Sequence, residues 1–528
     1  MIRQSLFITV LLLLCCGQLH EPFFFSFGVS IAQAGFIKYD RELNSGSHRT
    51  SAFAFYTHDD TPSKGRSGDG FPHLAFDLHF ETDNQQSTSG QVEVIAFDYA
   101  DYRNIGAYIP GMGRRLCCTP ETGYPTRCRS NGRVMFSSAI QNRADFRHEV
   151  LPLLNGTAEL VLSFEPTTKG IHVVYVVNCQ QDPSFDVHLS GTIAFSNPFG
   201  YLSGDDYGFL IFYESMFAVY LVMLLAWIVA CVYFREGLLA IQVCIGSLMF
   251  VGLVESLFYQ LFYMTYNQSG HVSYALLFLA VFFNTLKQTF SRLLLLLVAL
   301  GYPVVRRSIG PWATKTGVIA LTALYFVFCL WSEALGSLRE MTAIEVPLLW
   351  YLYFSVPLSV LNGIFAGWVI VAMVKTSQSL PRQPVKRAIY RKLLFLILVL
   401  ALIGLVATVL ETLLMAGPAR YANSWPWWWV WDALWQGLYA AVFLGVAALL
   451  RPNSNNTRFG YSELDDEEAE FSEQDDIAMA EMGVEVHEQS TDHAGSSDDN
   501  VDAGRGHLES DAETDIRSDV VVVDVHGV

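Results

Sequence analysis

The chain between residues 207 and 451 alternates long apolar segments with short polar ones. Most of the apolar segments hold about 20 residues, the length that an α-helix needs to cross the hydrocarbon core of a bilayer. The seven segments are Phe209–Phe234, Leu238–Thr265, Val272–Val305, Gly317–Trp331, Val346–Val374, Leu393–Ala416 and Trp427–Leu450. We therefore predict a seven-helix transmembrane bundle, whose fourth segment is the shortest and has the least defined ends.

The region from residue 35 to residue 200 has a different pattern, in which short runs alternate apolar and polar residues or cluster β-branched ones. Such runs include "HLAFDLHFET", "GQVEVIAFDY", "AELVLSF" and "GIHVVYVVNC", separated by turn signals such as "SKGRSGDG" and "TTKG". Seven or eight runs of this kind are typical of an antiparallel β-sandwich. We expect an all-β domain ahead of the bundle.

Residues 1–34 have the pattern of a secretory signal peptide. Arg3 is followed by the apolar core "LFITVLLLLCC", and the segment ends at "AQA", a small-x-small cleavage pattern. An uncleaved signal anchor is the alternative, favoured by the second apolar stretch "PFFFSFGVSIA". The signal peptide predicts that the β domain is lumenal or extracellular.

Four cysteines and one sequon in the β domain agree with that compartment. Behind a signal peptide, Cys117, Cys118, Cys128 and Cys179 indicate two disulfides, which can be connected in three ways. A bond between the neighbours Cys117 and Cys118 is disfavoured, and two cysteines left reduced are the alternative. Asn155-Gly-Thr is an N-glycosylation sequon.

Basic residues are unevenly distributed among the loops between the apolar segments. The loop at 375–392 holds six basic and no acidic residues, and "RRSIGPWATK" adds more basic ones. The three loops on the other side carry only two arginines between them. By the positive-inside rule, the β domain is lumenal and the C-terminal tail is cytosolic.

The tail at 452–528 carries the acidity of the whole chain. It holds 22 of the 51 acidic residues but only 3 of the 33 basic ones, so the rest of the chain is nearly neutral. A segment this acidic and poor in aromatic residues is expected to be disordered. Such acidity also argues against a nucleic-acid partner, because phosphates would be repelled.

The third apolar segment carries Lys287 and Arg292 near its middle, where a charge costs several kcal/mol. At helical spacing its polar residues form two adjacent stripes. They are Asn284, Lys287, Gln288 and Ser291, and then Thr285, Thr289 and Arg292. Acidic partners stand in other segments, at Glu255, Glu411 and Asp432. Glu333, near the end of a segment, is expected to be solvated.

These charges suggest a polar cavity. Our hypothesis is that Lys287 lines a lumen-facing cavity with Glu255, Glu411 and Asp432, able to hold a charged head group or an ion. The alternatives are that the charges only pair to hold helices together, or that Arg292 snorkels to the cytosolic head groups.

Three separated stretches carry a resemblance to a known family. They are "FDVHLSGTIAFSNPFGYLSGDDYGFLIFYESMFAVYLVMLLAW" before and in the first span, "LKQTFSRLLLLLVALGYPVVRR" in the third, and "LLRPNSNNTRFGYSELDDEEAE" after the seventh. Together they resemble the GOST family, the Golgi-dynamics-domain seven-transmembrane proteins, also called lung seven-transmembrane receptor-like. The last stretch is most similar to the transmembrane protein eighty-seven branch, and "CCTPETGYPTRC" is similar to the cysteine pattern of fungal and plant members.

The resemblance implies a lumenal GOLD-like β-sandwich over the bundle, and residence in Golgi, trans-Golgi and endosomal membranes. It implies a role in membrane trafficking, such as retrograde endosome-to-Golgi retrieval or cargo sorting, and a phospholipid bound in a central cavity without any other cofactor. Lys287, Arg292, Glu255 and Asp432 match charged positions of the family bundle. The last lumenal loop has no cysteine, so a disulfide from that loop to the β domain, which some relatives have, is not expected.

Membrane lipids and trafficking cargo are the expected partners. "YSEL", from Tyr461 to Leu464, fits the Tyr-x-x-apolar pattern that clathrin-adaptor subunits bind, although such short patterns also arise by chance.

A GPCR-like signalling receptor is an alternative function, but the third span ends in "GYPVVRR" rather than Asp-Arg-Tyr. A cation-conducting channel is another alternative, and the charges within the spans are the only feature that suggests it. The chain contains no paired-histidine zinc motif, nucleophile elbow or phosphate loop, so we do not expect an enzyme.

Overall fold

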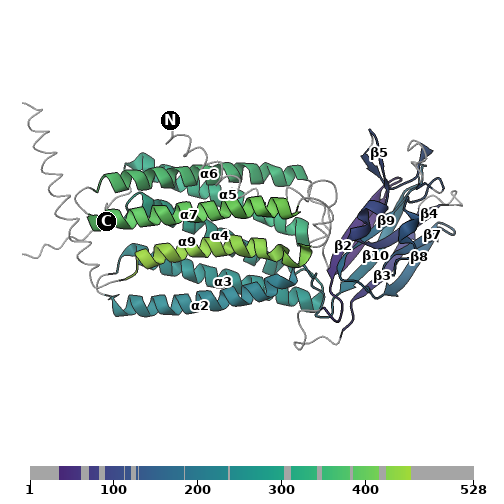
Figure 1. Ribbon diagram of the computed structural model, residues 1–528, viewed down its shortest axis with the longest axis horizontal. Coiled ribbons are helices and arrows are strands. Elements are labelled where there is room, and N and C mark those ends of the chain that lie inside the picture. The colour runs from purple at the N-terminus through teal and green to yellow at the C-terminus, as the bar shows by residue number, and fades with distance from the viewer. Residues whose placement is uncertain are drawn as a thin grey trace, which may run out of the picture. The chain divides into compact units, whose positions relative to one another are not determined.

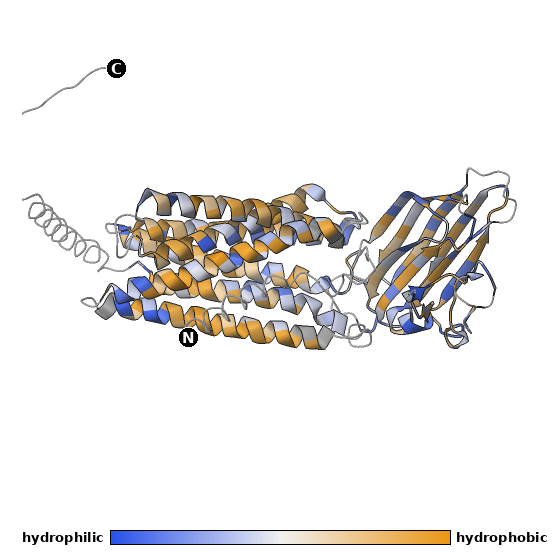
Figure 2. Cartoon of the chain, turned by 90° about the horizontal axis from the view of Figure 1, so that it is seen from above, coloured by the Kyte–Doolittle hydropathy of each residue, from blue (hydrophilic) through white to orange (hydrophobic). Residues whose placement is uncertain are grey.

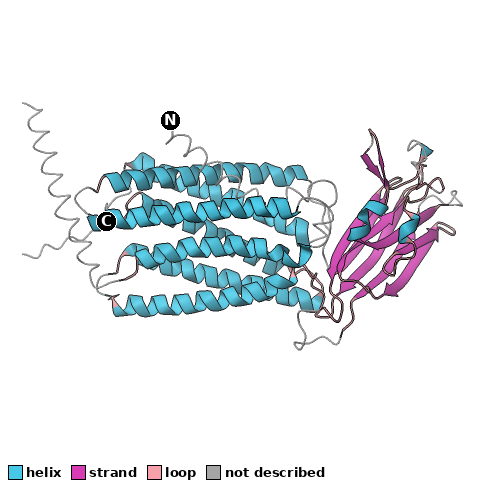
Figure 3. Ribbon diagram, viewed as in Figure 1, coloured by secondary structure: helices cyan, strands magenta, loops and turns pink. Residues whose placement is uncertain are grey.

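The computed structural model describes residues 35–60, 70–82, 90–111, 113–120, 127–128, 130–182, 185–235, 238–302, 311–341, 348–380, 384–415 and 424–452. The predicted signal peptide at 1–34 and the acidic tail from residue 453 onward, with Tyr461 and Leu464, lie outside these residues. In the described part, strands come first and helices follow (Figure 1, Figure 3).

The N-terminal domain is the predicted all-β domain, and that prediction is confirmed. Two four-stranded antiparallel sheets have the strand orders β1-β10-β3-β8 and β2-β9-β4-β7, and β5 and β6 form a separate hairpin. The strands are β1 Phe36–Leu43, β2 His48–Phe55, β3 His73–Glu81, β4 Gln91–Asp98, β5 Ala107–Ile109, β6 Gly113–Arg115, β7 Arg147–Pro152, β8 Thr157–Phe164, β9 Gly170–Val177 and β10 Val187–Ser196.

An apolar core lies between the two sheets. Successive residues of a strand point to opposite faces, so the alternation in β3 buries Phe76, Leu78 and Phe80 and exposes Asp77 and His79 between them. The rings of Phe53 from β2 and Phe195 from β10 stack across this core, with centroids 5.2 Å apart. The alternating colours along the strands in Figure 2 show the same pattern.

Strand β9 is buried throughout rather than on alternate residues, because both of its faces are covered. Its outer face packs against residues from the long connection between β4 and β7, including Ile105, Val134 and Phe136. That connection holds the short 3₁₀ helices Tyr99–Asn104 and Ser138–Ile140. The sandwich therefore has a third apolar layer on one side.

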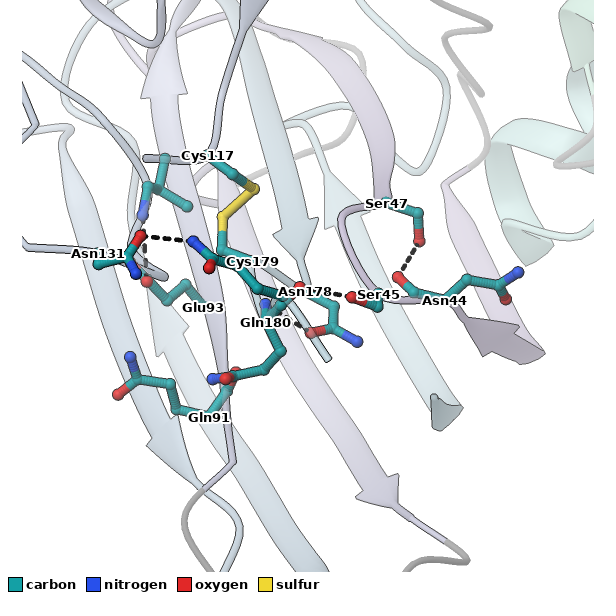
Figure 4. Close-up of a disulfide and its surroundings, with 12 residues drawn as sticks. Asn44, Ser45, Ser47, Gln91, Glu93, Cys117, Asn131, Asn178, Cys179 and Gln180 are labelled. Atoms are coloured by element: carbon teal, nitrogen blue, oxygen red, sulfur yellow. Dashed lines mark hydrogen bonds between the residues drawn. A yellow bond between two sulfur atoms is a disulfide. The ribbon is translucent and has the colours of Figure 1, made fainter. Parts of the chain in front are cut away.

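Two disulfides fix this connection, and they resolve the connectivity that the sequence left open. Cys117 pairs with Cys179 directly after β9, as Figure 4 shows, and Cys118 pairs with Cys128. Beside the first bond, the amide of Asn178 donates to the carbonyl oxygens of Leu43 and Phe185, at 3.1 and 3.0 Å. The β4–β7 connection is thus tied covalently to the sheet it covers.

The predicted glycosylation sequon lies at the turn between β7 and β8. Asn155 is exposed and has a φ of 56°, and Gly156 follows with a φ of 83°. Asparagine and glycine are the residues that tolerate this left-handed conformation in tight hairpin turns. The position is accessible, and glycosylation of Asn155 stays a prediction.

A buried carboxylate joins the β7 and β9 ends of the second sheet. Asp145 Oδ1 accepts hydrogen bonds from the backbone N–H and the hydroxyl of Thr167, both at 2.8 Å, and Oδ2 accepts from the N–H and hydroxyl of Thr168. His172 Nε2 lies 3.6 Å from Oδ2. Burial raises the pKa of Asp145, but the nearby His172 imidazole and the hydrogen bonds from Thr168 and Thr167 outweigh it and hold the pKa below its ordinary value.

We expect Asp145→Asn to lower the free energy of unfolding by about 2 kcal/mol at pH 7, because the new amide would face the Thr168 N–H. A depressed carboxyl pKa adds stability above the ordinary value of 3.8, and this stability is lost as pH falls through the folded-state pKa. The gap between wild type and variant should therefore shrink below pH 3.8. Thermal unfolding between pH 7 and pH 2.5 measures it, with the exposed Asp59→Asn as control; a gap that is constant with pH would contradict the assignment.

Seven helices long and apolar enough to cross a membrane follow the β domain, as predicted. The colours in Figure 2 show that these helices consist mostly of hydrophobic residues. They are α2 Tyr207–Tyr233, α3 Ala240–Ser269, α4 Tyr274–Ala299, α5 Trp312–Met341, α6 Leu348–Gln378, α7 Pro384–Met415 and α9 Trp428–Leu449. The protein is a multi-pass membrane protein.

Two helices extend well beyond the apolar segments that predicted them. Helix α5 has 30 residues and is not short, because its backbone stays helical through the polar residues at both ends of the apolar stretch. Helix α7 begins at Pro384, ahead of the apolar stretch, and includes basic residues of the preceding loop. Proline is well tolerated at the first position of a helix, since its missing N–H would have no partner there.

Helix α4 is the central helix of the bundle. It packs against α3, α5 and α6, and its Lys287 also contacts α9. Helix α2 packs against α3 and α9, and α7 packs against α6 and α9. The charged third span is therefore in contact with four other helices.

Aromatic residues at the start of the last span contact the β domain. Trp425, in the 3₁₀ turn Trp425–Trp427, lies within the outer apolar layer of the second sheet, with its ring 4.8 Å from that of Tyr56. Gly204 donates its N–H to the carbonyl oxygen of Ala54 at 2.9 Å. A Cβ on Gly208 would lie 2.2 Å from Trp429, so this approach requires glycine.

Candidate functional site

The lysine at the middle of α4 forms a buried ion pair. Lys287 Nζ lies 2.7 Å from Oε1 and 2.6 Å from Oε2 of Glu255 on α3, and only 3% and 2% of the two side chains are exposed. A charge in the middle of a bilayer must be compensated within the protein. Glu255 supplies the opposite charge, and the structure brings these two predicted residues together.

The last helix completes the surroundings of the lysine. Gln436 on α9 accepts a hydrogen bond from Lys287 Nζ at 2.8 Å, and the ring of Tyr439, one turn later, lies 4.9 Å from the same nitrogen. An ammonium over an aromatic face is stabilised by the ring quadrupole. Three helices that are distant in sequence therefore meet at one ammonium group.

A second polar cluster on α4 includes residues of both stripes. Asn284 and Gln288 each donate to the carboxylate of Glu333 on α5, at 3.3 Å. Arg292 donates to the side-chain oxygen of Asn362 on α6 at 2.9 Å and to the backbone oxygen of Gln288 at 3.1 Å. The expectation that Glu333 is solvated was wrong, because α5 extends far enough to place it against α4.

Arg292 points into the bundle and does not snorkel. Its guanidinium carbon lies 4.7 Å from the centroid of the Tyr325 ring, and its Nε–H is used by Asn362. Ser291, another predicted cavity residue, donates its hydroxyl to the backbone oxygen of Gln288 at 2.8 Å. Helix α4 thus carries two polar clusters, one around Lys287 and one around Arg292.

The other two predicted acidic residues belong to α9 and α7. Asp432 lies one turn before Gln436 on α9 and is exposed. The side chain of Glu411 lies outside the described residues, although its backbone belongs to α7. Gln436 and Tyr439 supply the contacts from the last helix, and no charge in the sequence pointed to them.

A pair of aspartates at the start of α2 is buried near Asp432. Asp206 is 6% exposed, and among the described residues its Oδ2 has no hydrogen-bond partner. Burial raises the pKa of Asp206, and the neighbouring carboxylates of Asp205 and Asp432 raise it further. Ser203 donates its hydroxyl to Asp205. The start of α2 is thus rich in acidic groups.

One buried tyrosine of α2 interacts electrostatically with Glu255. Tyr220 of α2 is 2% exposed and packs against Gly252 of α3, where an added Cβ would lie 2.7 Å from its ring. Its OH makes no hydrogen bond to any residue that the structure describes, and it lies within electrostatic range of Glu255 and Tyr439. A buried hydroxyl without a partner costs free energy, more so where no bulk water can reach it.

The seven helices match a known family model, and the chain aligns with several known proteins. The model is "GOST, seven transmembrane domain", matched over residues 208–457. Similar proteins include Transmembrane protein 87A of Xenopus tropicalis, 29% identical over 58% of this chain and 56% of that protein. Transmembrane protein 87B of Mus musculus is 26% identical over 60% of this chain and 56% of that protein.

A fungal relative aligns over more of the chain. Membrane protein PTM1 of Saccharomyces cerevisiae is 23% identical over 80% of this chain and 81% of that protein. The chain spans little more than half the length of the 87A and 87B relatives. The matched region contains all seven spans and the Lys287 cluster. With the fold and the matched region in agreement, the seven-helix part of the chain, residues 208–457, belongs to the GOST seven-transmembrane domain family.

Proposed function

We propose that this protein acts in membrane trafficking at the Golgi and endosomes, and that its bundle binds the polar head of a lipid or of a lipidated cargo beside Lys287. In this proposal the β domain is lumenal, the tail is cytosolic, and clathrin adaptors bind the "YSEL" segment of the tail. The observation that carries the binding proposal is the buried Tyr220 hydroxyl, which makes no hydrogen bond within the described part of the chain and lies within electrostatic range of Glu255, the partner of Lys287.

The chemistry of this cluster suits a head group with both charges. Lys287 and Glu255 neutralise each other in the structure, so a ligand that bears both a phosphate and an ammonium could exchange with the pair without leaving an unpaired charge. Gln436 and the Tyr220 hydroxyl offer neutral hydrogen-bonding groups to the same ligand. A single anion or cation would leave Glu255 or Lys287 without compensation.

Tyr220→Phe tests this proposal with little disturbance to the fold. If a ligand oxygen bonds the hydroxyl, we expect the variant to retain about two- to tenfold less phospholipid after purification in detergent, as the loss of one hydrogen bond of about 0.5–1.5 kcal/mol predicts. Lipid is measured by mass spectrometry of the extracted protein. Tyr233→Phe, at the exposed far end of the same helix, is the matched control.

The opposite result is equally informative. Where no ligand is present, removing an unpaired buried hydroxyl should leave lipid retention unchanged and raise the melting temperature. That outcome would make the Lys287 cluster a packing device and would overturn the binding proposal.

A further inference from the structure

The outer face of the sheet β1-β10-β3-β8 carries an unusual concentration of histidines and carboxylates. Its inward residues form the core, so every second residue of each strand faces outward. The exposed residues on this face include His73, Asp77, His79 and Glu81 of β3, Glu159 of β8, Asp40 and Glu42 of β1, and His188 of β10. Each histidine but His73 has a carboxylate within ion-pair distance.

One imidazole is placed between two carboxylates on adjacent strands. His79 Nε2 lies 3.4 Å from Asp77 Oδ1, and His79 Nδ1 lies 3.9 Å from Glu159 Oε1. His79 and Glu159 are direct partners in the antiparallel pairing of β3 and β8, and Asp77 lies two residues earlier on the same face. One ligand atom of each residue lies within 4.8 Å of the other two.

A second imidazole is close to this group. His188 of β10 is the direct partner of Glu81, and the next outward residue of β10, Ser190, is the partner of His79. His188 is therefore a diagonal neighbour of His79, and its Nε2 lies 3.1 Å from Asp40 Oδ1. The register places two histidine–carboxylate pairs side by side on one rigid sheet.

We infer that Asp77, His79 and Glu159 form a binding site for a divalent transition-metal ion of the zinc type. One imidazole and two carboxylates are ligands that such ions take, at about 2.0–2.2 Å, with a fourth position left open. The ligand atoms need only side-chain rotation to converge, because the strand register already places them on one side of the sheet. This inference does not depend on the proposed function of the bundle.

A metal ion accounts for this arrangement better than ion pairing alone does. With neutral histidine, His79 would give two carboxylates only one N–H donor, and the three side chains are 52–62% exposed, where an ion pair contributes little. A metal ion uses both carboxylates and one imidazole nitrogen at once. Its open position faces solvent and could accept a ligand atom from a partner.

The test is zinc binding by the full-length protein, purified in detergent with a tag that contains no histidine and stripped with a chelator. We expect zinc titration at pH 7.5 to show binding that His79→Ala or Glu159→Gln weakens at least about tenfold, the usual minimum for disturbing a metal site. His73→Ala, a change of the same kind on the same strand and face, should leave the affinity unchanged. Affinity should fall in acid, because a protonated imidazole cannot bind metal.

Cobalt substitution identifies the ligands. The four cysteines of the β domain are in disulfides, but Cys231, Cys244 and Cys329 are free thiols in the bundle. A thiolate charge-transfer band in the cobalt spectrum would place the metal there and overturn the inference. Equal affinity in wild type and His79→Ala, an equal loss in His73→Ala, or no zinc binding at pH 7.5 would overturn it as well.

Discussion

Replacing Lys287 with alanine is expected to lower the free energy of unfolding by about 3–5 kcal/mol, because it leaves the buried carboxylate of Glu255 without its partner. Gln436 loses its hydrogen-bond donor in the same variant. Denaturant titration in mixed micelles, with the circular dichroism of the helices as signal, measures the change. Lys315→Ala is the matched control, since Lys315 is exposed on α5 and its removal should cost less than about 0.5 kcal/mol.

The double variant Lys287→Met/Glu255→Met separates the penalty of an orphaned charge from the value of the pair. Buried ion pairs can often be replaced by apolar residues of similar volume with little loss of stability, so we expect the double variant to unfold near wild type. Glu255→Met alone should be as harmful as Lys287→Ala. Two single variants that each cost less than about 1 kcal/mol would contradict a dry, direct pair and indicate that solvent reaches both groups.

Removing the disulfide Cys117–Cys179 with a double serine substitution is expected to destabilise the β domain by about 4 kcal/mol. The bond closes a loop with a sequence separation of 62 residues, and the entropy that it removes from the unfolded chain grows with loop length. Limited proteolysis of the full chain as a function of denaturant concentration reports the unfolding of this domain.

The second disulfide is the internal comparison. Cys118–Cys128 has a sequence separation of only 10 residues, so its removal should cost about 3 kcal/mol in the same treatment. The order of the two effects is the decisive result. If loss of the shorter loop were the more harmful, the Cys117–Cys179 bond would not be what holds the β4–β7 connection on β9.

Sequence periodicity was sufficient for the fold class but not for the bounds of every element. The alternation in β3 reflects a strand that is buried on one face only. The long apolar segments reflect helices that are long enough to cross a bilayer. Helix α5 was predicted too short because the prediction followed the apolar residues alone. The helix continues into the polar residues on both sides of the apolar segment. That error also led to the wrong expectation for Glu333.

Charge revealed one half of the candidate site, and neutral residues formed the other half. A lysine in an apolar helix demands a carboxylate, so Glu255 could be anticipated, but Glu255, Glu411 and Asp432 were equal candidates until helix packing distinguished them. Gln436 and Tyr439 lie in a span rich in aromatic residues and carry no charge, so nothing in the sequence marked them. Disulfide connectivity likewise required the three-dimensional proximity of Cys179 to Cys117.

The order of the helices along the chain also bears on biogenesis. Glu255 is synthesised before Lys287, on the helix that neighbours α4 and precedes it, so the lysine can be neutralised as soon as α4 emerges from the ribosome. Glu333 arrives with the next helix, and Gln436 arrives only with the last. Since a lone lysine at mid-membrane opposes insertion by several kcal/mol, α3 and α4 should leave the translocon as a hairpin. The ion pair would then act first as a step of membrane insertion and only later as part of the finished bundle.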